Sequence, residues 1–206
     1  MSDQPSNEKT RLRNLKRALE EIDRLAGELN ILGDARTRGT SIYRQLREEG
    51  KLPGRSVEEI VAASLYLACR DHEIPRSPDE FVAHTKYDRT TILRAATYIE
   101  EVLGLDIPPA NPRIYLDKIG DELNLKQATI EEAKKLIDAA EDENALNGVS
   151  PTGGAAGAIY AAGQVTGEQP TQASVADATD VSQVTIRKRY QEILQARSEA
   201  TSDESG

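Results

Sequence analysis

The sequence has 206 residues, one cysteine, two histidines and a formal net charge of −9 at pH 7. This length suits about two domains of roughly a hundred residues each. One cysteine excludes an internal disulfide, and so few cysteines and histidines exclude a structural zinc site. No apolar stretch approaches the roughly 20 residues that cross a bilayer. We therefore expect a soluble cytoplasmic protein with no membrane contact, no metal and no cofactor.

The first half of the chain carries helical patterns. Leucine and isoleucine recur every three or four residues from Leu12 to Leu29, which predicts an amphipathic helix. Ser56 and Ser77 each stand three residues before a glutamate, as in a capping box. The further helices predicted in this half are 34–49, 60–69, one that begins at Ser77-Pro78 and one that begins near Asp88.

Cap residues mark the helices of the second half. Serine, threonine and asparagine are favoured at the N-cap, and proline is harmless at the first helical position because its missing N–H has no partner there. Helix starts are predicted at Asn111-Pro112, Ser150-Pro151, Thr171 and Ser182.

The two halves match each other at a constant spacing of 94 residues. Pairing 22–99 with 116–193 without a gap gives 15 identities in 78 pairs, where unrelated chains give roughly 5. We therefore predict an all-α fold of two tandem five-helix repeats, over 9–105 and 106–197, with a joint at 104–110.

The two ends of the chain lack such a pattern. Residues 1–8 and the acidic residues 198–206 are polar and contain no core-forming periodicity. We expect both to be disordered tails.

One helix in each repeat, 60–69 and 154–163, is apolar on nearly every side, which predicts a central position in its domain. Glycines weaken the second of these helices in isolation, so we expect neighbouring helices to pack closely against it. A glycine-rich phosphate loop is excluded because no Gly-Lys-Ser/Thr follows the glycines.

The segment 172–190 has the spacing of a helix-turn-helix. Ala176 is the small residue of the first helix, Ile186 is the apolar anchor of the second, and Asp180 replaces the usual turn glycine. Short polar groups and an arginine near the start of such a helix suit base edges, and the basic residues that follow suit phosphates. An ordinary solvated face is the alternative, and this segment alone does not decide between them. The residues expected to be exposed are Ser182, Gln183, Thr185, Arg187, Lys188 and Arg189.

The matching segment of the first repeat lacks the basic run. Leu93 and Arg94 stand opposite Arg187 and Lys188. We expect that only the second repeat recognises DNA sequence, while the first repeat binds a partner or the DNA backbone.

Catalytic patterns are not found in the sequence. His72 and His84 have no nucleophile spaced to pair with either of them. We predict that the protein is not an enzyme, and that Cys69, Tyr66 and Tyr160 are core residues.

Two segments carry a family resemblance. The first is 54–80, with GRSVEEIVAASLYLACR and IPRSPDE, and the second is 150–190, with SPTGGAAGAIYAAG and TQASVADATDVSQVTIRKRY. They resemble the two cyclin-like repeats of archaeal transcription factor B, the counterpart of the eukaryotic general initiation factor IIB. The resemblance implies a monomeric initiation factor that docks on the TATA-binding protein at promoter DNA. It also implies that the helix-turn-helix of the second repeat recognises an element upstream of the TATA box.

The resemblance also assigns roles to residues. Val184 and Arg187 match positions that touch base edges, and Arg55 and Arg70 match basic positions near DNA or the TATA-binding protein. The weaker neighbours of Val184 and Arg187 are Gln183, Thr185, Lys188 and Arg189.

Two departures from the family pattern are visible. Family members normally begin with a cysteine-rich zinc ribbon and a linker that engage RNA polymerase, and neither is in this sequence. A complete chain would bind promoters without the usual polymerase contact; a core fragment is the alternative, although Met1 favours a natural start. Gln169-Pro170 also replaces a basic pair that the family often carries before Thr171.

A different class of function stays open. The acidic net charge favours a cyclin-like adaptor or regulator that engages the TATA-binding protein without recruiting polymerase, whereas the cluster from Arg187 to Arg189 favours DNA contact.

Overall fold

The computed structural model describes residues 4–52 and 54–203 and forms two compact units, Met1–Pro109 and Ala110–Gly206. Every regular element in these described ranges is a helix. The predicted all-α class and the two tandem five-helix repeats are therefore confirmed. The division between the units falls four residues after the boundary expected from the sequence, because the segment that follows the last helix of the first unit packs back on that unit through Ile107.

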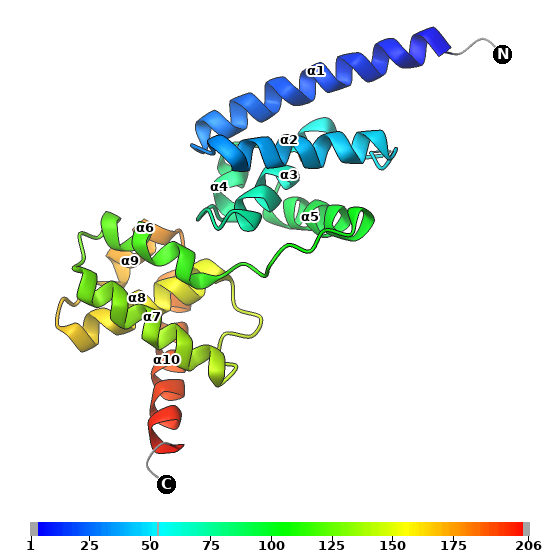
Figure 1. The fold of residues 1–206 in the computed structure, drawn as a ribbon. Coiled ribbons are helices and arrows are strands. Elements are labelled where there is room, and N and C mark those ends of the chain that lie inside the picture. Colours follow the sequence, from blue (N-terminus) through cyan, green and yellow to red (C-terminus); the bar gives the residue numbers. More distant parts are fainter. Residues whose placement is uncertain (1–3, 53, 204–206) are drawn as a thin grey trace. The chain divides into compact units, whose positions relative to one another are not determined.

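Each unit is built from five α-helices, which Figure 1 labels. A 3₁₀ turn precedes the first α-helix of the second unit. The first unit contains α1 (Gln4–Glu28), α2 (Gly33–Glu48), α3 (Val57–Asp71), α4 (Pro78–Ala83) and α5 (Arg89–Leu103). The second contains η1 (Pro112–Tyr115), α6 (Leu116–Glu122), α7 (Gln127–Asp142), α8 (Pro151–Thr166), α9 (Gln172–Thr179) and α10 (Gln183–Asp203).

The backbone conformation of the first unit also recurs in the second unit at the same spacing of 94 residues. The helices α2 and α7 begin and end at equivalent positions. Four left-handed residues of the first unit also have left-handed equivalents in the second. These pairs are Asn30 and Asn124, Gly50 and Asn144, Gly54 and Gly148, and Glu73 and Gly167. Left-handed backbone is costly for most residues, so its recurrence at one spacing shows that the turns are duplicated along with the helices.

The predicted N-caps are present in both units. Ser77 forms a complete capping box with Glu80. Ser56 accepts the Glu59 N–H, but the Glu59 carboxylate pairs with Arg55, so the capping box expected there is only half formed. The other predicted caps that accept a backbone N–H with their side chains are Asp88, Asn111, Ser150, Thr171 and Ser182.

The helices α3 and α8 form the centres of their units, as predicted. Every residue from Ile60 to Cys69 is buried, and so is all of 153–163 except Tyr160, which is half-buried. A Cβ atom built on Gly157 would lie 2.5 Å from Arg189 Cβ, so this glycine allows the neighbouring helix α10 to pack against α8. The close packing inferred from the glycines is therefore observed. Burial also raises the pKa of the Cys69 thiol to about 12.

Helical structure extends into both segments expected to be disordered tails. The helix α1 begins at Gln4, and α10 continues to Asp203. The sequence argument located helix ends from apolar periodicity, whereas an existing helix can continue through turns that contribute nothing to the core, because adding a residue to a helix is easier than starting one. Residues 1–3 and 204–206 lie outside the described residues. Among the described helices none is both long enough and apolar enough to span a membrane.

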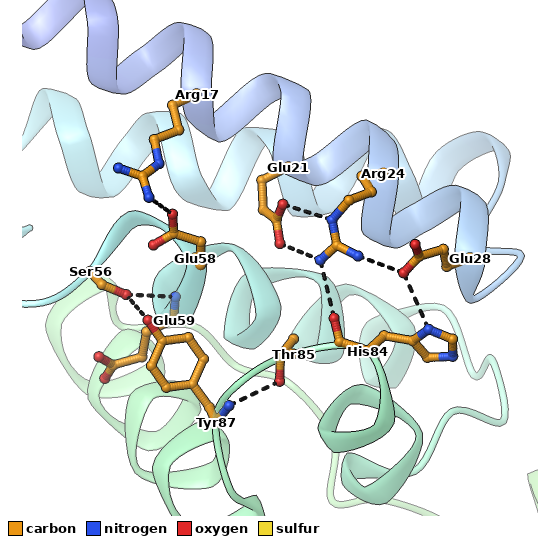
Figure 2. Close-up of polar contacts among 10 residues, drawn as sticks. All are labelled: Arg17, Glu21, Arg24, Glu28, Ser56, Glu58, Glu59, His84, Thr85 and Tyr87. Atoms are coloured by element: carbon orange, nitrogen blue, oxygen red, sulfur yellow. Dashed lines mark hydrogen bonds and ion pairs between the residues drawn. The ribbon is translucent and has the colours of Figure 1, made fainter.

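The C-terminal half of α1 is held to the turn that follows α4 by a polar network (Figure 2). Arg24 pairs with Glu21 and Glu28 and donates to the backbone oxygen of His84 at 3.1 Å. His84 Nδ1 lies 3.2 Å from the Glu28 carboxylate. Long-range side-chain contacts therefore fix this turn in the first unit.

Candidate nucleic-acid interface

The helix-turn-helix of the second unit consists of α9, a short turn and the beginning of α10. Thr171 starts α9 by accepting the Ser174 N–H at 3.0 Å. Thr179, at the end of α9, donates its hydroxyl to the Val175 carbonyl and accepts the Val181 N–H. The second of these bonds joins the end of α9 to the turn that follows it.

Asp180 sets the path of this turn. Its φ is +55°, in the left-handed region expected for the residue that replaces glycine. Ser182 then begins α10 by accepting the Thr185 N–H at 3.2 Å. Lys86, the equivalent of Asp180 in the first unit, is not among the left-handed residues. The two turns therefore have different backbone conformations.

Apolar residues fix the rotation of α10 about its axis. Ile186, Ile193 and Ala196 are buried in the core of the second unit and lie on one side of the helix. The opposite side faces solvent. We name the part of it formed by residues 183–191 the α10 outer face, and the exposed residues there are Gln183, Val184, Arg187, Lys188 and Gln191.

The α10 outer face combines one apolar side chain with two cations. Val184 is 81 % exposed, more than any other large hydrophobic residue in the described ranges. Arg187 is exposed and has no ion-pair partner among the described residues. The Lys188 ammonium is 64 % exposed and lies 3.9 Å from Glu192, so this ion pair is weak. All three side chains are accessible to a partner.

Arg189 and Thr185 do not share this face. The Arg189 side chain is only 20 % exposed, donates to Glu192 at 2.5 Å, and has a buried Nε without a partner in the described structure. A Cβ atom on Gly157 would lie 2.5 Å from Arg189 Cβ, so Arg189 packs on α8. The expectation that Arg189 is exposed is wrong, because close packing of α8 and α10 turns this position inward.

Arg55 lies at the start of α3 in the first unit. Its guanidinium stacks over the Tyr98 ring, 4.3 Å from the centroid, and pairs with Glu59 at 2.9 Å. The side chain remains 30 % exposed. Arg55 therefore has a fixed orientation and some remaining access to a partner.

Arg70 has an internal role that the sequence did not indicate. Its side chain is 16 % exposed, pairs with Glu100 at 3.0 Å and donates to the Pro108 carbonyl at 2.7 Å. These bonds join the end of α3 to α5 and to the segment that follows α5. The structure therefore accounts for Arg70 without a DNA phosphate or a partner protein.

The first unit presents a different surface at the equivalent of the α10 outer face. The residues of α5 that match Val184, Arg187 and Lys188 are Thr90, Leu93 and Arg94. Thr90 and Arg94 are exposed, but Leu93 is half-buried against the core. Arg89, the equivalent of Gln183, is also exposed and pairs with Asp79 at 3.4 Å. This face therefore carries two cations, as the α10 outer face does, but no exposed apolar residue.

Sequence reasoning missed Gln191, which lies on the α10 outer face two turns after Val184. The signal that could have identified it is helical periodicity, because residues i, i+3, i+4 and i+7 share a face. A lone glutamine after a basic run has no distinctive chemistry and was therefore passed over.

Other kinds of site receive little support in the described part of the chain. No group of three or more histidine, cysteine, aspartate or glutamate residues there could hold a metal ion. His84 takes part in the network of Arg24 and Glu28, and Cys69 is buried.

Comparisons with known proteins agree with this architecture. Residues 11–101 and 105–196 both match the family described as "Transcription factor TFIIB repeat". Transcription initiation factor IIB 6 of Halobacterium salinarum is 40% identical over 184 residues, which are 89% of this chain and 58% of that relative. Transcription initiation factor IIB of Archaeoglobus fulgidus is 39% identical over 183 residues, 89% of this chain and 56% of that relative.

The chain therefore spans a little under three fifths of the length of these curated relatives. Among solved structures, a viral cyclin from herpesvirus saimiri is similar, with a TM-score of 0.40 and 15% identity over 89% of this chain and 86% of that chain. The two family matches together cover most of both units. The chain belongs to the family of transcription factor TFIIB repeat proteins.

Proposed function

We propose that this protein is a general transcription initiation factor that binds the TATA-binding protein and promoter DNA. In this proposal the α10 outer face reads an element upstream of the TATA box. The observation that carries it is the pairing of an 81 % exposed Val184 with an exposed arginine, Arg187, at the start of the second helix of a helix-turn-helix.

The chemistry of this face suits a major groove. The N-terminal residues of a recognition helix meet base edges, where an apolar side chain can contact the thymine methyl group and an arginine can bind guanine O6 and N7. Lys188 and Gln191 continue the same face and suit phosphate oxygens. Of the α10 residues expected to contact DNA, Gln183, Val184, Arg187 and Lys188 are retained, whereas the half-buried Thr185 and Arg189 are not. In the first unit, Arg55 is retained and Arg70 is not, because the Arg70 side chain is bound within that unit.

The acidic net charge does not oppose this assignment locally. The first eight residues of α10 contain Arg187, Lys188 and Arg189 and no carboxylate. Electrostatic attraction to phosphate depends on the charges near the contact, because salt screens charges more than about 10 Å away. A basic helix start on an acidic protein can therefore still approach DNA.

The partners in this proposal follow from the family. The docking partner is the TATA-binding protein on promoter DNA, the protein acts as a monomer, and its place in the cell is the cytoplasm, at the nucleoid when in use. Arg55, held over Tyr98 and partly exposed, is the first-unit residue proposed to lie near DNA or the TATA-binding protein.

One observation favours a second function. The net charge of −9 disfavours contact with phosphate away from the basic start of α10. The alternative is an adaptor or regulator that engages the TATA-binding protein and makes no specific DNA contact. In that case Val184 would contact protein.

A mobility-shift assay with promoter duplex and TATA-binding protein tests the proposal. Arg187→Ala is expected to weaken the ternary complex by about 1–3 kcal/mol, the usual value of one bidentate base contact. Lys135→Ala is the matched control, because Lys135 is 75 % exposed on α7 of the same unit and is the same kind of charge loss. Equal binding by both variants would favour the adaptor function.

A further inference from the structure

A tyrosine hydroxyl in the first unit is buried without a hydrogen-bond partner. Tyr43 on α2 is 0 % exposed, and its Oη forms no hydrogen bond in the described structure. A buried hydroxyl without a partner costs folding free energy. The equivalent residue of the second unit is Ile137, which is buried to the same extent and carries no polar group. Filling the core therefore does not explain the Tyr43 hydroxyl.

Tyr43 lines a cavity of about 660 Å³ in the first unit. We name it the Tyr43 cavity. Its walls come from the N-terminal part of α1, the end of α2 and the start of α3. Thr10 and Asn14 contribute polar groups from α1, and Leu52 and Val57 contribute apolar surface. The cavity therefore connects a buried hydroxyl with a space that is large enough for a small molecule.

Arg47 brings an unpaired positive charge to this cavity. It lies one helical turn after Tyr43 on α2, so the two side chains are neighbours on one side of the helix. Arg47 is half-buried and forms no ion pair and no side-chain hydrogen bond with the described residues. Burial raises the pKa of Tyr43, and the charge of Arg47 opposes this shift, which indicates that the guanidinium lies near the hydroxyl. The two groups together are a pair of unused hydrogen-bond donors.

The start of α3 adds positive potential to the same cavity. The first N–H groups of a helix have no partner within it, and they form the positive end of the helix dipole. The helix α3 has 15 residues and begins at Val57, next to its N-cap Ser56, and both residues line the cavity. The Ser56 hydroxyl is already used, because it accepts the Glu59 N–H and is hydrogen-bonded to the Tyr87 hydroxyl (Figure 2). What α3 offers to a ligand is therefore its N–H groups.

The charged side chains of the lining favour an anion. They are two arginines, Arg47 and Arg55, and one glutamate, Glu48. Arg55 is held by its carboxylate partner and by the Tyr98 ring, so Arg47 is the cation that remains for a ligand. Glu48 is exposed, and solvent screens its repulsion, whereas the half-buried Arg47 is screened less. The balance at the buried end of the cavity is therefore positive.

We propose that the Tyr43 cavity binds a small oxyanion of the phosphate class. The Tyr43 hydroxyl and the Arg47 guanidinium donate to its oxygens, and the first N–H groups of α3 stabilise its negative charge. Hydrogen bonds to a charged oxygen are stronger than those between neutral groups, and helix N-termini commonly bind phosphate. The site lies in the first unit and does not rest on the DNA contact proposed for α10.

Other occupants fit this cavity less well. A cation would be repelled by Arg47 and by the start of α3. An apolar molecule would leave the Tyr43 hydroxyl unpaired. A phosphate of duplex DNA is joined to two sugars and stays at the surface of its partner, whereas Tyr43 has no exposed area.

Nuclear magnetic resonance of the full chain, titrated with inorganic phosphate at constant ionic strength, tests the proposal. We expect saturable shifts at millimolar phosphate in the amide signals of Val57 and Glu58 and in the ring signals of Tyr43. Shifts that grow without saturation would indicate an adventitious ion only. No shift at these positions would indicate that the Tyr43 hydroxyl meets water alone. Either result would overturn the proposal.

Two substitutions locate the site. Tyr43→Phe removes only the hydroxyl and should weaken phosphate binding about tenfold, the effect of losing one hydrogen bond to a charged group. The variant should be at least as stable as the unmodified chain in urea unfolding without phosphate, because the hydroxyl has no partner in the described structure. Arg47→Gln should weaken phosphate binding by a similar factor.

Arg44→Gln is the matched control for Arg47→Gln. Arg44 is an exposed arginine of the same helix, it forms no ion pair with the described residues, and it is not part of the cavity lining. We expect Arg44→Gln to bind phosphate as the unmodified chain does. Equal loss in both arginine variants, or no loss in Tyr43→Phe, would refute the site.

A mobility-shift assay separates a free phosphate from a phosphate of DNA. Tyr43→Phe should leave the complex with promoter duplex and TATA-binding protein unchanged, whereas Arg187→Ala should weaken it. A complex weakened equally by both substitutions would assign the cavity to DNA and overturn the proposal. The phosphate titration itself contains no DNA, so its result does not depend on the function proposed for α10.

Discussion

Gly157 of α8 lies directly against the backbone of Arg189 in α10. A Cβ atom at Gly157 would come within 2.5 Å of Arg189 Cβ and 3.1 Å of its carbonyl carbon. The equivalent pair in the first unit is Ala63 and Ala95, both fully buried. This contact sets how closely α10 sits on the second unit and therefore how far the α10 outer face projects.

Gly157→Ala should displace α10. The gain in helix propensity is about 1 kcal/mol, whereas overpacking against a helix backbone costs roughly 1–3 kcal/mol. We expect lower stability in urea unfolding and a weaker DNA complex. Gly154→Ala is the control, because its Cβ would meet Pro112 at an ordinary 3.4 Å. A Gly157→Ala chain as stable and as active as Gly154→Ala would contradict this role.

Asp180→Gly should stabilise the second unit. A non-glycine residue in the left-handed region costs about 1–2 kcal/mol, less for aspartate, so we expect a gain of up to about 1 kcal/mol. Lys86→Gly is the matched control at the equivalent position, which is not left-handed. There the added freedom of the unfolded chain should cost about 0.5–1 kcal/mol. Circular dichroism during urea unfolding measures the change in the free energy of unfolding for each variant. A change of the same sign in both variants would refute the explanation.

Arg70→Ala should lower stability without a direct effect on DNA binding. It removes the ion pair with Glu100 and the bond to the Pro108 carbonyl, at a cost of about 1.5–3 kcal/mol for hydrogen bonds to a charged group. Thermal unfolding measures the loss of stability. A mobility-shift assay at a temperature where the variant is folded then measures any direct effect on DNA binding. Unchanged stability together with lost DNA binding would contradict this internal role. It would instead indicate that Arg70 contacts DNA or the TATA-binding protein, as the family resemblance implied.

Glu168 should contribute a pH-dependent part of the stability. Its carboxylate accepts the Thr129 hydroxyl at 2.5 Å and the Lys126 N–H at 3.0 Å, and these bonds hold the pKa of Glu168 below the ordinary 4.5. Because the folded-state pKa is the lower one, the stabilisation is full above the unfolded-state value and is lost as the pH falls through the folded-state value.

The measurement is the change in urea midpoint between pH 7 and an acidic pH below 4.5. Glu168→Gln should show a smaller change than the unmodified chain. Glu143→Gln removes one carboxylate whose side chain makes no hydrogen bond in the described structure, and it controls for net charge. An unaltered pH response in Glu168→Gln would show that these bonds do not set the titration.

Local chemistry predicted much of this fold. Cap residues such as Ser77 and Thr171 act through hydrogen bonds to residues three positions away, so the sequence alone locates them. The helix-turn-helix spacing likewise placed Ile186 inside, whereas the outward position of Val184 followed from the family resemblance. The left-handed turn at Asp180 followed from its place in the helix-turn-helix spacing.

Long-range contacts could not be predicted in the same way. Arg70 reaches residues 30 and 38 positions away, and no local pattern distinguishes it from an arginine that faces a partner. Arg189 appeared to belong to one basic run with Arg187, but its contact with Gly157 depends on how two helices cross.

Photo-crosslinking tests the central claim, that the α10 outer face contacts promoter DNA, most directly. A benzophenone amino acid replaces Val184 in one chain and Lys135 in another, and each is irradiated with labelled promoter duplex and TATA-binding protein. We predict a crosslink to DNA upstream of the TATA box from position 184 and none from position 135. A crosslink from position 184 to protein alone, or equal DNA labelling from both positions, would contradict the account.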